Sequence, residues 1–211
     1  MTNILNLLER DLMICFHSVR FYAILALCFC FSIAVVLKIE PAYVEYIIVL
    51  ANVWVFSTVL LDLLVYREII KNRIPHFLAF GFNIFELMLG KSIFISFFSL
   101  YITFLFVSFF RVMSFFFNHN YTFISLWNFL ILIPVLFFIV SISVYLVFRF
   151  QMSRPLRLIL GVVMLLLNEF KEIITKYSGS FLAVLGLIAF FIIGNILIIK
   201  FLGGIKNEDI I

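Results

Sequence analysis

Long apolar runs, separated by short polar stretches, form the main pattern along the chain. A helix needs about 20 apolar residues to cross the hydrocarbon core of a bilayer. Backbone groups in lipid must be hydrogen-bonded internally, and the strands of a membrane barrel would alternate polar and apolar residues, so helices are expected. The predicted fold is all-α, a polytopic membrane protein with six transmembrane helices. The expected spans are Phe21–Leu37, Tyr43–Val65, Ser92–Phe110, Phe123–Phe148, Pro155–Phe170 and Phe181–Phe201.

The first 20 residues follow a different pattern, in which apolar residues recur every three or four positions. The apolar stripe consists of Met1, Leu5, Leu8, Leu12, Cys15 and Val19. The residues opposite are Asn3, Asn6, Arg10 and His17. This spacing predicts an amphipathic helix over residues 1–20 that lies at the membrane interface. The alternative is the start of the first span, which is disfavoured by the four charged residues before Phe21.

The composition agrees with a membrane protein. Apolar residues make up 66% of the chain, charged residues 12%, and the mean hydropathy is +1.27. Soluble domains contain about 45–50% apolar and about 25% charged residues. We expect one six-helix transmembrane domain over residues 21–203 and a cytoplasmic tail over residues 204–211.

The net charge of +4 indicates membrane topology and not nucleic-acid binding. If the N-terminus lies inside, eleven of the 15 Lys and Arg residues fall in inner segments. The outer segments hold Lys38, Arg111, Lys171 and Lys176. Cytoplasmic loops carry such an excess of Lys and Arg. We therefore expect a multi-pass protein of the plasma membrane with both termini in the cytoplasm.

Residues 67–91, between the second and third expected spans, end in Gly90-Lys91-Ser92, which is similar to a phosphate-binding loop. That loop needs a glycine five residues before the Gly-Lys pair, and Phe85 stands there. We expect neither ATPase activity nor a bound cofactor in this chain. The three histidines lack metal-site spacing and the three cysteines suggest no disulfide framework, so no metal site or catalytic residue is predicted.

The same segment resembles the permease subunits of ABC-2 type ABC transporters. The resemblance rests on Arg67-Glu68, on Phe77-Leu78-Ala79-Phe80-Gly81 and on Gly90-Lys91. The sequence departs from the family pattern in two places. The family's Gly-Thr is replaced near Lys71-Asn72, and its turn proline is Gly81 here, a residue that also allows a tight turn.

The resemblance implies a cytoplasmic coupling helix between helices 2 and 3 that docks on a separate ABC ATPase subunit, where ATP and Mg are bound. The implied docking residues are Arg67, Glu68, Lys71, Asn72, Arg73, Phe77, Leu78 and Phe80. The apolar residues would be anchors, and Glu68, Lys71 and Arg73 would form a polar rim.

The resemblance further implies a homodimer or heterodimer of permeases surrounded by membrane lipid. The function expected from it is export of an amphipathic or lipophilic substrate, such as a peptide, lipid or drug. Two alternatives stay open. The segment can be an ordinary loop whose aromatic residues lie on lipid headgroups, and the chain can be a membrane scaffold or assembly factor without transport activity.

Four polar residues outside this segment are candidates for gating or for a substrate pathway. Asn52 and Asn195 lie deep in the second and sixth expected spans, where packing through interhelical hydrogen bonds is the alternative. Asp62 lies near the inner end of the second span, within reach of water or Arg67. Glu169 follows the fifth span, in an outer gate or a solvated loop.

Overall fold

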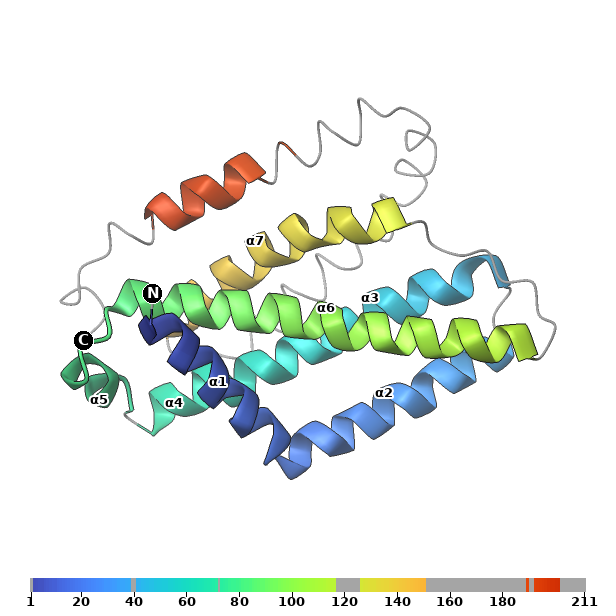
Figure 1. The fold of residues 1–211 in the computed structure, drawn as a ribbon, viewed down its shortest axis with the longest axis horizontal. Coiled ribbons are helices and arrows are strands. Elements are labelled where there is room, and N and C mark those ends of the chain that lie inside the picture. Colours follow the sequence, from blue (N-terminus) through green and yellow to red (C-terminus); the bar gives the residue numbers. More distant parts are fainter. Residues whose placement is uncertain are drawn as a thin grey trace.

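The structure is a computed structural model that describes residues 2–38, 41–71, 73–116, 126–150, 189 and 192–201. Helices are the only regular elements of these residues, which confirms the all-α class. The elements in chain order are α1 (Thr2–Phe16), α2 (Val19–Lys38), α3 (Pro41–Leu61), the π-helix η1 (Asp62–Tyr66), α4 (Arg67–Ile70), α5 (Ile74–Ala79), α6 (Ile84–Phe116), α7 (Leu126–Phe150) and the helix Ile192–Phe201 (Figure 1).

Three of the described helical stretches are long and apolar enough to cross a membrane, which indicates a membrane-embedded protein. They are Val19–Val36, Ile48–Ile70 and Ile84–Met113, and they correspond to the first three expected spans. The fourth expected span coincides with α7, whose residues 133–149 form a shorter apolar helix. The fifth lies outside the described residues, as does the tail over residues 204–211. The total of six spans stays a prediction.

The long helix α6 lies at the centre of the packing, in contact with α1, α3 and α7, while α2 packs on α3 (Figure 1). Small hydroxyl residues line the buried side of α6 at intervals of three or four positions, namely Ser92, Ser96, Ser99 and Thr103. The Ser57 hydroxyl of α3 donates to Ser99 Oγ at 3.3 Å. Small residues let apolar helices approach closely, which explains the tight contact between α3 and α6.

The second span does not end as a regular α-helix. It continues through the π-helix Asp62–Tyr66 directly into α4, and Leu63, Leu64 and Val65 are all buried. A π-turn inserts an extra residue and rotates everything that follows about the helix axis. The sequence pattern did not predict this element, which immediately precedes Arg67 and Glu68.

The third span begins earlier than expected. The prediction began the span at Ser92, but α6 runs without interruption from Ile84 to Phe116. Its start is fixed by a reciprocal cap. The Phe85 amide donates to Asn83 Oδ1 at 3.4 Å, and the Asn83 amide donates to Glu86 Oε2 at 3.2 Å. Gly90 and Lys91 consequently lie inside a helix.

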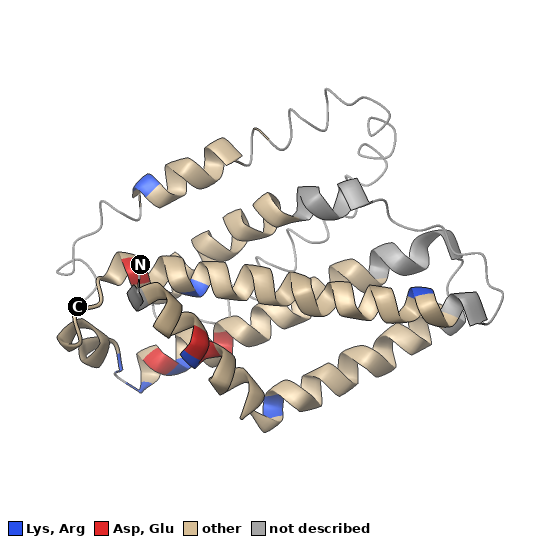
Figure 2. Cartoon of the chain, in the orientation of Figure 1, with Lys and Arg blue, Asp and Glu red and all other residues tan. Residues whose placement is uncertain are grey.

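The N-terminal helix is shorter than predicted, because α1 ends at Phe16 and Val19 already belongs to α2. In the described chain, many charged residues gather toward the end of the bundle where α4, α5 and the start of α6 meet (Figure 2). Part of α1 lies over this end. The candidate site is therefore built from segments that are far apart in the sequence.

Candidate functional site

The segment after α4 projects from the end of the bundle as one short helix and two turns. Lys71 and Arg73 are exposed between α4 and α5. Pro75 is the second residue of α5, in the first helical turn, where its missing N–H is no loss. Gly81 has φ +81°, a conformation that glycine adopts without strain, and it turns the chain back toward α6. Asn72 lies outside the described residues.

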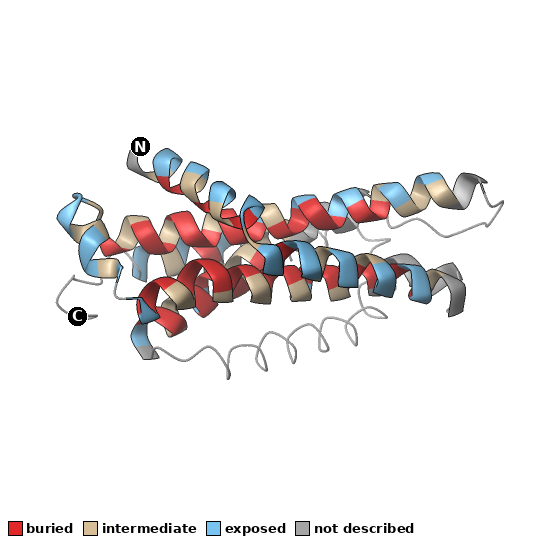
Figure 3. Cartoon of the chain, turned by 90° about the horizontal axis from the view of Figure 1, so that it is seen from below, coloured by how far each residue is buried: buried red, intermediate tan, exposed pale blue. Residues whose placement is uncertain are grey.

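The predicted apolar anchors differ in their surroundings. Phe80 is 81% exposed, and nearby Ile70, which the sequence analysis did not select, is 61% exposed. Phe77 and Leu78 are partly buried against the core, and the Phe77 ring meets Phe82 edge-on at 5.9 Å. No residue of α5 is fully buried (Figure 3). Apolar surface is therefore free at Ile70 and Phe80.

Glu68 has a different place from the one predicted. It was expected in an exposed polar rim, but its side chain is 8% exposed and points into the bundle. Glu68 Oε1 accepts a hydrogen bond from Arg10 at 2.7 Å, and Glu68 Oε2 lies 3.0 Å from Lys91 Nζ. The rim assignment is wrong for this residue because the helix continues past Tyr66 and turns the carboxylate toward α1 and α6.

Two further ion pairs close a buried network, which we call the charge cluster: Arg10, Asp11, Glu68 and Lys91. Lys91 Nζ donates to Asp11 Oδ1 at 2.7 Å, and Arg10 donates to the same oxygen at 2.8 Å. The side chains of Asp11 and Lys91 are both 0% exposed. The cluster joins α1, α4 and α6.

The charge cluster is electrically balanced, with two acidic and two basic groups. Burial of an isolated charge is so unfavourable that ions persist inside proteins only when paired and hydrogen-bonded. Hydrogen bonding within the charge cluster is incomplete, because Arg10 Nε and Asp11 Oδ2 are buried without a hydrogen-bond partner among the described residues. Such an arrangement fixes relative positions more than it adds stability.

Arg10 also connects the charge cluster to α5. Its guanidinium carbon lies 4.2 Å from the centre of the Phe77 ring, within the range of a cation–π interaction. The guanidinium therefore contacts α5 through Phe77 and α4 through Glu68. These contacts connect the exposed segment with α1 and, through the ion pair of Glu68 and Lys91, with α6.

A close approach between α1 and α6 makes the charge cluster possible. A Cβ atom added at Gly90 would lie 2.6 Å from Leu7 Cδ2. Gly90, the residue before Lys91 in α6, thus leaves space for Leu7. Leu7 in turn lies one helical turn before Asp11 in α1. The resemblance implied Gly90-Lys91 as an entry into the third span, whereas the structure places the pair at this helix crossing.

The two faces of α1 explain why its prediction was partly wrong. Leu7, Asp11 and Cys15, four residues apart, form the buried face. Leu5 and Leu12 of the predicted apolar stripe are exposed, as expected for a stripe that meets lipid. Arg10, assigned to the water-facing side, instead points to the protein interior. Figure 3 shows the exposed outer side of this helix.

Cys15 adjoins the charge cluster but has no nucleophilic character. Burial, with a smaller contribution from the Asp11 charge, raises the pKa of its thiol to about 12. The thiolate is the nucleophile and the metal ligand, so a protonated thiol does neither. In the described residues no group of His, Cys, Asp and Glu is arranged to hold a metal ion.

Three of the other candidate residues are described. Asn52 Nδ2 lies 3.3 Å from Ser32 Oγ of α2, and Asn195 Nδ2 donates to the Pro134 carbonyl of α7 at 2.9 Å. Both are interhelical contacts, as the packing alternative expected. Asp62 is half-buried at the start of η1. Glu169 lies outside the described residues.

The sequence analysis missed Arg10, Asp11 and Lys91 as site residues. It used Arg10 for the polar face of the N-terminal helix and Lys91 for the resemblance to the permease family, and it counted both for membrane orientation. One signal was present, since Asp11 falls on the same helix face as the apolar residues Leu7 and Cys15. Its partner Lys91 is 80 residues away in sequence.

Comparison of the chain with protein-family models, with curated proteins and with solved structures finds no match in any of the three.

Proposed function

We propose that this chain is the membrane subunit of an ATP-driven transporter of the ABC-2 permease type, and that residues 67–80 dock on a separate ATP-binding subunit. One observation carries the proposal. A short segment with free apolar surface projects from the bundle, and buried ion pairs tie its base to two further helices. An ordinary loop needs no such connection.

The exposed residues of the segment suit a protein partner. Ile70 and Phe80 offer two apolar contact points, and Lys71 and Arg73 are exposed around them. Apolar anchors surrounded by charged groups are typical of protein interfaces, where the charges give orientation and the anchors give affinity. An acidic groove with an apolar floor is the complementary surface.

The charge cluster supplies the transmission that such a transporter needs. ATP binding in the partner would favour one position of residues 67–80, and the contacts of Glu68 and Arg10 would pass this bias to α1 and α6. A ligand shifts a two-state equilibrium only through different affinities for the two states. ATP and Mg stay in the partner, and this chain performs no covalent chemistry.

The rest of the expected arrangement belongs to the same proposal. Two copies, identical or related, pair in the plasma membrane with both termini in the cytoplasm. The substrate is amphipathic or lipophilic, because the buried residues of the described bundle are mainly apolar and most of the buried polar ones are serines and threonines. Export is the expected direction.

The test is site-specific photo-crosslinking to an ATP-binding subunit, which we expect to be encoded by a neighbouring gene. A photoreactive phenylalanine analogue replaces Phe80, and the matched control carries it at exposed Asn6 of α1. We expect a covalent adduct with the ATP-binding subunit from position 80 and none from position 6. In the same co-expression, Phe80→Asp should reduce co-purification of the ATP-binding subunit about ten-fold, whereas Asn6→Asp should not.

Two results would overturn the proposal. One is a well-folded Phe80→Asp variant that retains the ATP-binding subunit at the wild-type level. The other is a wild-type chain that purifies in a stable assembly without any ATP-binding subunit, a result that favours the scaffold alternative.

A further inference from the structure

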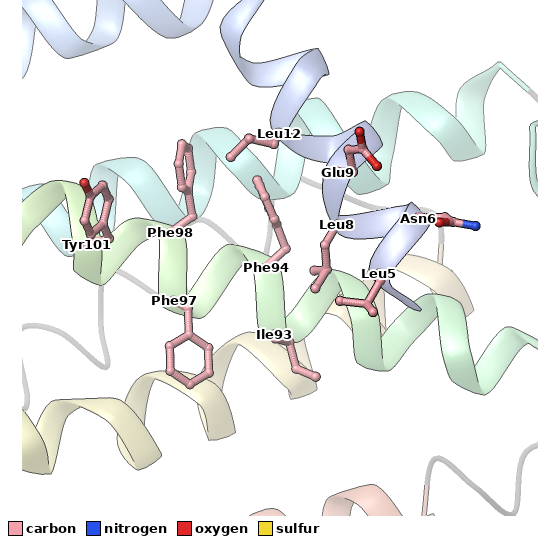
Figure 4. Close-up of a pocket in the computed structure, with 10 residues that line it drawn as sticks. All are labelled: Leu5, Asn6, Leu8, Glu9, Leu12, Ile93, Phe94, Phe97, Phe98 and Tyr101. Atoms are coloured by element: carbon pink, nitrogen blue, oxygen red, sulfur yellow. The ribbon is translucent and has the colours of Figure 1, made fainter. Parts of the chain in front are cut away.

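A groove runs between α1 and α6, and none of the residues that line it belongs to α5. Its volume is about 600 Å³, within the range of about 300–1,000 Å³ that small-molecule sites occupy. Figure 4 shows Leu5 and Leu12 of α1 on one side and Phe94 and Phe97 of α6 on the other. The groove contributes nothing to the charge cluster or to residues 67–80.

The α6 wall of the groove lies inside a stretch that is long enough to cross a membrane. Phe94, Phe97 and Tyr101 all belong to Ile84–Met113. Phe97 and Tyr101 are exposed, while Phe94 stacks on Phe98 at 5.0 Å and forms a firm floor. In a bilayer this wall faces acyl chains, so a hydrocarbon chain is the natural occupant of the apolar part.

The two helices that form the groove are held at a fixed separation. Gly90 admits Leu7, and Asp11 is bound to Lys91. Farther along, the Phe16 ring meets Phe98 edge-on at 6.3 Å. The groove is therefore a built feature of the α1–α6 crossing, which distinguishes it from the open lipid-facing sides of the single helices.

The charge at the groove is of one sign. Among the described residues that line it, Glu9 is the one with a charged side chain, and Asn6 also lines it from α1 (Figure 4). The neighbouring Arg10 is engaged in the charge cluster. A carboxylate attracts an ammonium group and repels a phosphate that carries no compensating amine. Polar groups on α1 and an apolar wall on α6 match the two parts of a lipid.

From this arrangement we propose that the groove binds a membrane phospholipid with an amine-bearing headgroup. One acyl chain lies along Phe94, Phe97 and Tyr101, and the ammonium group lies at the Glu9 carboxylate beside Asn6. The site selects an amine headgroup over a purely anionic one. It is independent of the docking of residues 67–80 and would exist in a scaffold protein too.

The experiment measures bound lipid on the full-length chain by native mass spectrometry. The probes are phosphatidylethanolamine and phosphatidylglycerol with identical acyl chains, added in competition to delipidated protein. We expect phosphatidylethanolamine to be retained about five-fold better, the preference of an exposed ion pair. Glu9→Gln should bring the ratio close to one, and Glu9→Lys should reverse it.

A second pair of variants tests the place of the acyl chain. Ile93→Trp puts a large ring into the groove and should remove the bound lipid whatever its headgroup. Val112→Trp makes a large exposed side chain elsewhere on α6 and should retain it. Equal lipid loss in both variants, or a headgroup ratio unaffected by Glu9→Lys, would mean unselective surrounding lipid and overturn the proposal. A dimer that Ile93→Trp dissociates without any lipid effect would overturn it in favour of a second copy of the chain.

Discussion

Two short helices at the same end of the bundle, α1 and α5, are held in opposite ways. The 15 residues of α1 have a buried face that includes the charged Asp11, and the helix is tied to α6 by the Asp11–Lys91 ion pair. The six residues of α5 include none that is buried, and its Phe77 contacts Arg10. Helix α1 is thus fixed to the bundle by an ion pair, whereas the outer side of α5 is exposed.

The difference shows what buried charges contribute in a helix that is otherwise apolar. Leu5, Leu12, Met13 and Phe16 are exposed around α1, so apolar contact alone would allow the helix to slide or rotate in a membrane interface. An ion pair stabilises a structure only while its charged groups keep a specific geometry. We therefore infer that the buried Asp11–Lys91 pair fixes the position and orientation of α1 on α6. Among the residues that the structure describes, α5 has no equivalent ion pair and is held by the partly buried Phe77 and Leu78.

The largest effect is expected when one charge of the Asp11–Lys91 ion pair is removed. Lys91→Met leaves the buried carboxylates of Asp11 and Glu68 with Arg10 alone. Breaking a buried ion pair in this way costs about 3–5 kcal/mol of the free energy of unfolding. Unfolding in mixed micelles with increasing SDS measures the change, and Lys71→Met, at an exposed lysine of the free segment, is the matched control.

A double variant sharpens this result. Asp11→Asn with Lys91→Met keeps Arg10 and Glu68 as a balanced pair 2.7 Å apart, so it should lose less stability than the sum of the two single variants. Additive losses would contradict a charge cluster that acts as one unit.

The second effect concerns the space that lets α1 approach α6. Gly90→Leu should destabilise the chain by about 1–3 kcal/mol, because its side chain meets Leu7 where even a Cβ would lie at 2.6 Å. Leu7→Ala removes most of the side chain that the new leucine meets, so the double variant should be more stable than Gly90→Leu alone. Ala79→Leu, at an exposed position of α5, is the control for leucine in a helix of the same region. A Gly90→Leu chain as stable as the wild type would show that the Asp11–Lys91 ion pair does not depend on the close approach of α1 and α6 at Gly90.

The same comparison shows which features can be predicted from the sequence. Helices follow from apolar runs such as Phe21–Leu37, because a bilayer imposes length and composition on each span. The turn at Gly81 and the start of α5 beside Pro75 follow from local backbone preferences. Each of these is a property of a few neighbouring residues.

The features that the sequence analysis missed depend on distant partners. In the sequence, Glu68 is indistinguishable from any other charged residue at the end of a span, because the π-helix η1 that precedes it is not visible in the apolar pattern. Lys91 is paired with Asp11, a residue 80 positions away. An acid among apolar residues signals that a partner exists but not which residue it is. The sequence could therefore select residues 67–80 as a candidate site, whereas the contacts of Glu68 with Arg10 and Lys91 could not be predicted.

A smaller effect on stability is expected at the free helix and its turn. Phe80→Ser should change the free energy of unfolding by no more than about 0.5 kcal/mol, since an exposed side chain loses few contacts. Phe77→Ser removes the contacts with Arg10 and Phe82 and should cost about 1–2 kcal/mol. SDS unfolding of the two variants side by side measures the contrast. Equal losses would show that Phe80 is held by the bundle as firmly as Phe77.

The smallest effect is expected at Cys15, on the locked helix, when a maleimide is added to the folded chain. An ordinary thiol with a pKa of 9.0 is half ionised at pH 9, whereas a pKa of about 12 leaves about one thiol in a thousand ionised. Because the folded pKa is the higher one, the thiol favours unfolding only as the pH rises from 9 toward 12, and stability below pH 9 is unaffected.

With Cys28 and Cys30 replaced by Ala, Cys15 should stay unlabelled at pH 7–8 until SDS unfolds the chain. Met13→Cys, on the exposed side of the same helix and with Cys15 also replaced by Ala, should be labelled at once. Rapid labelling of Cys15 in the folded chain would mean that α1 leaves α6 often, and the distinction between a locked and a free helix would then fail.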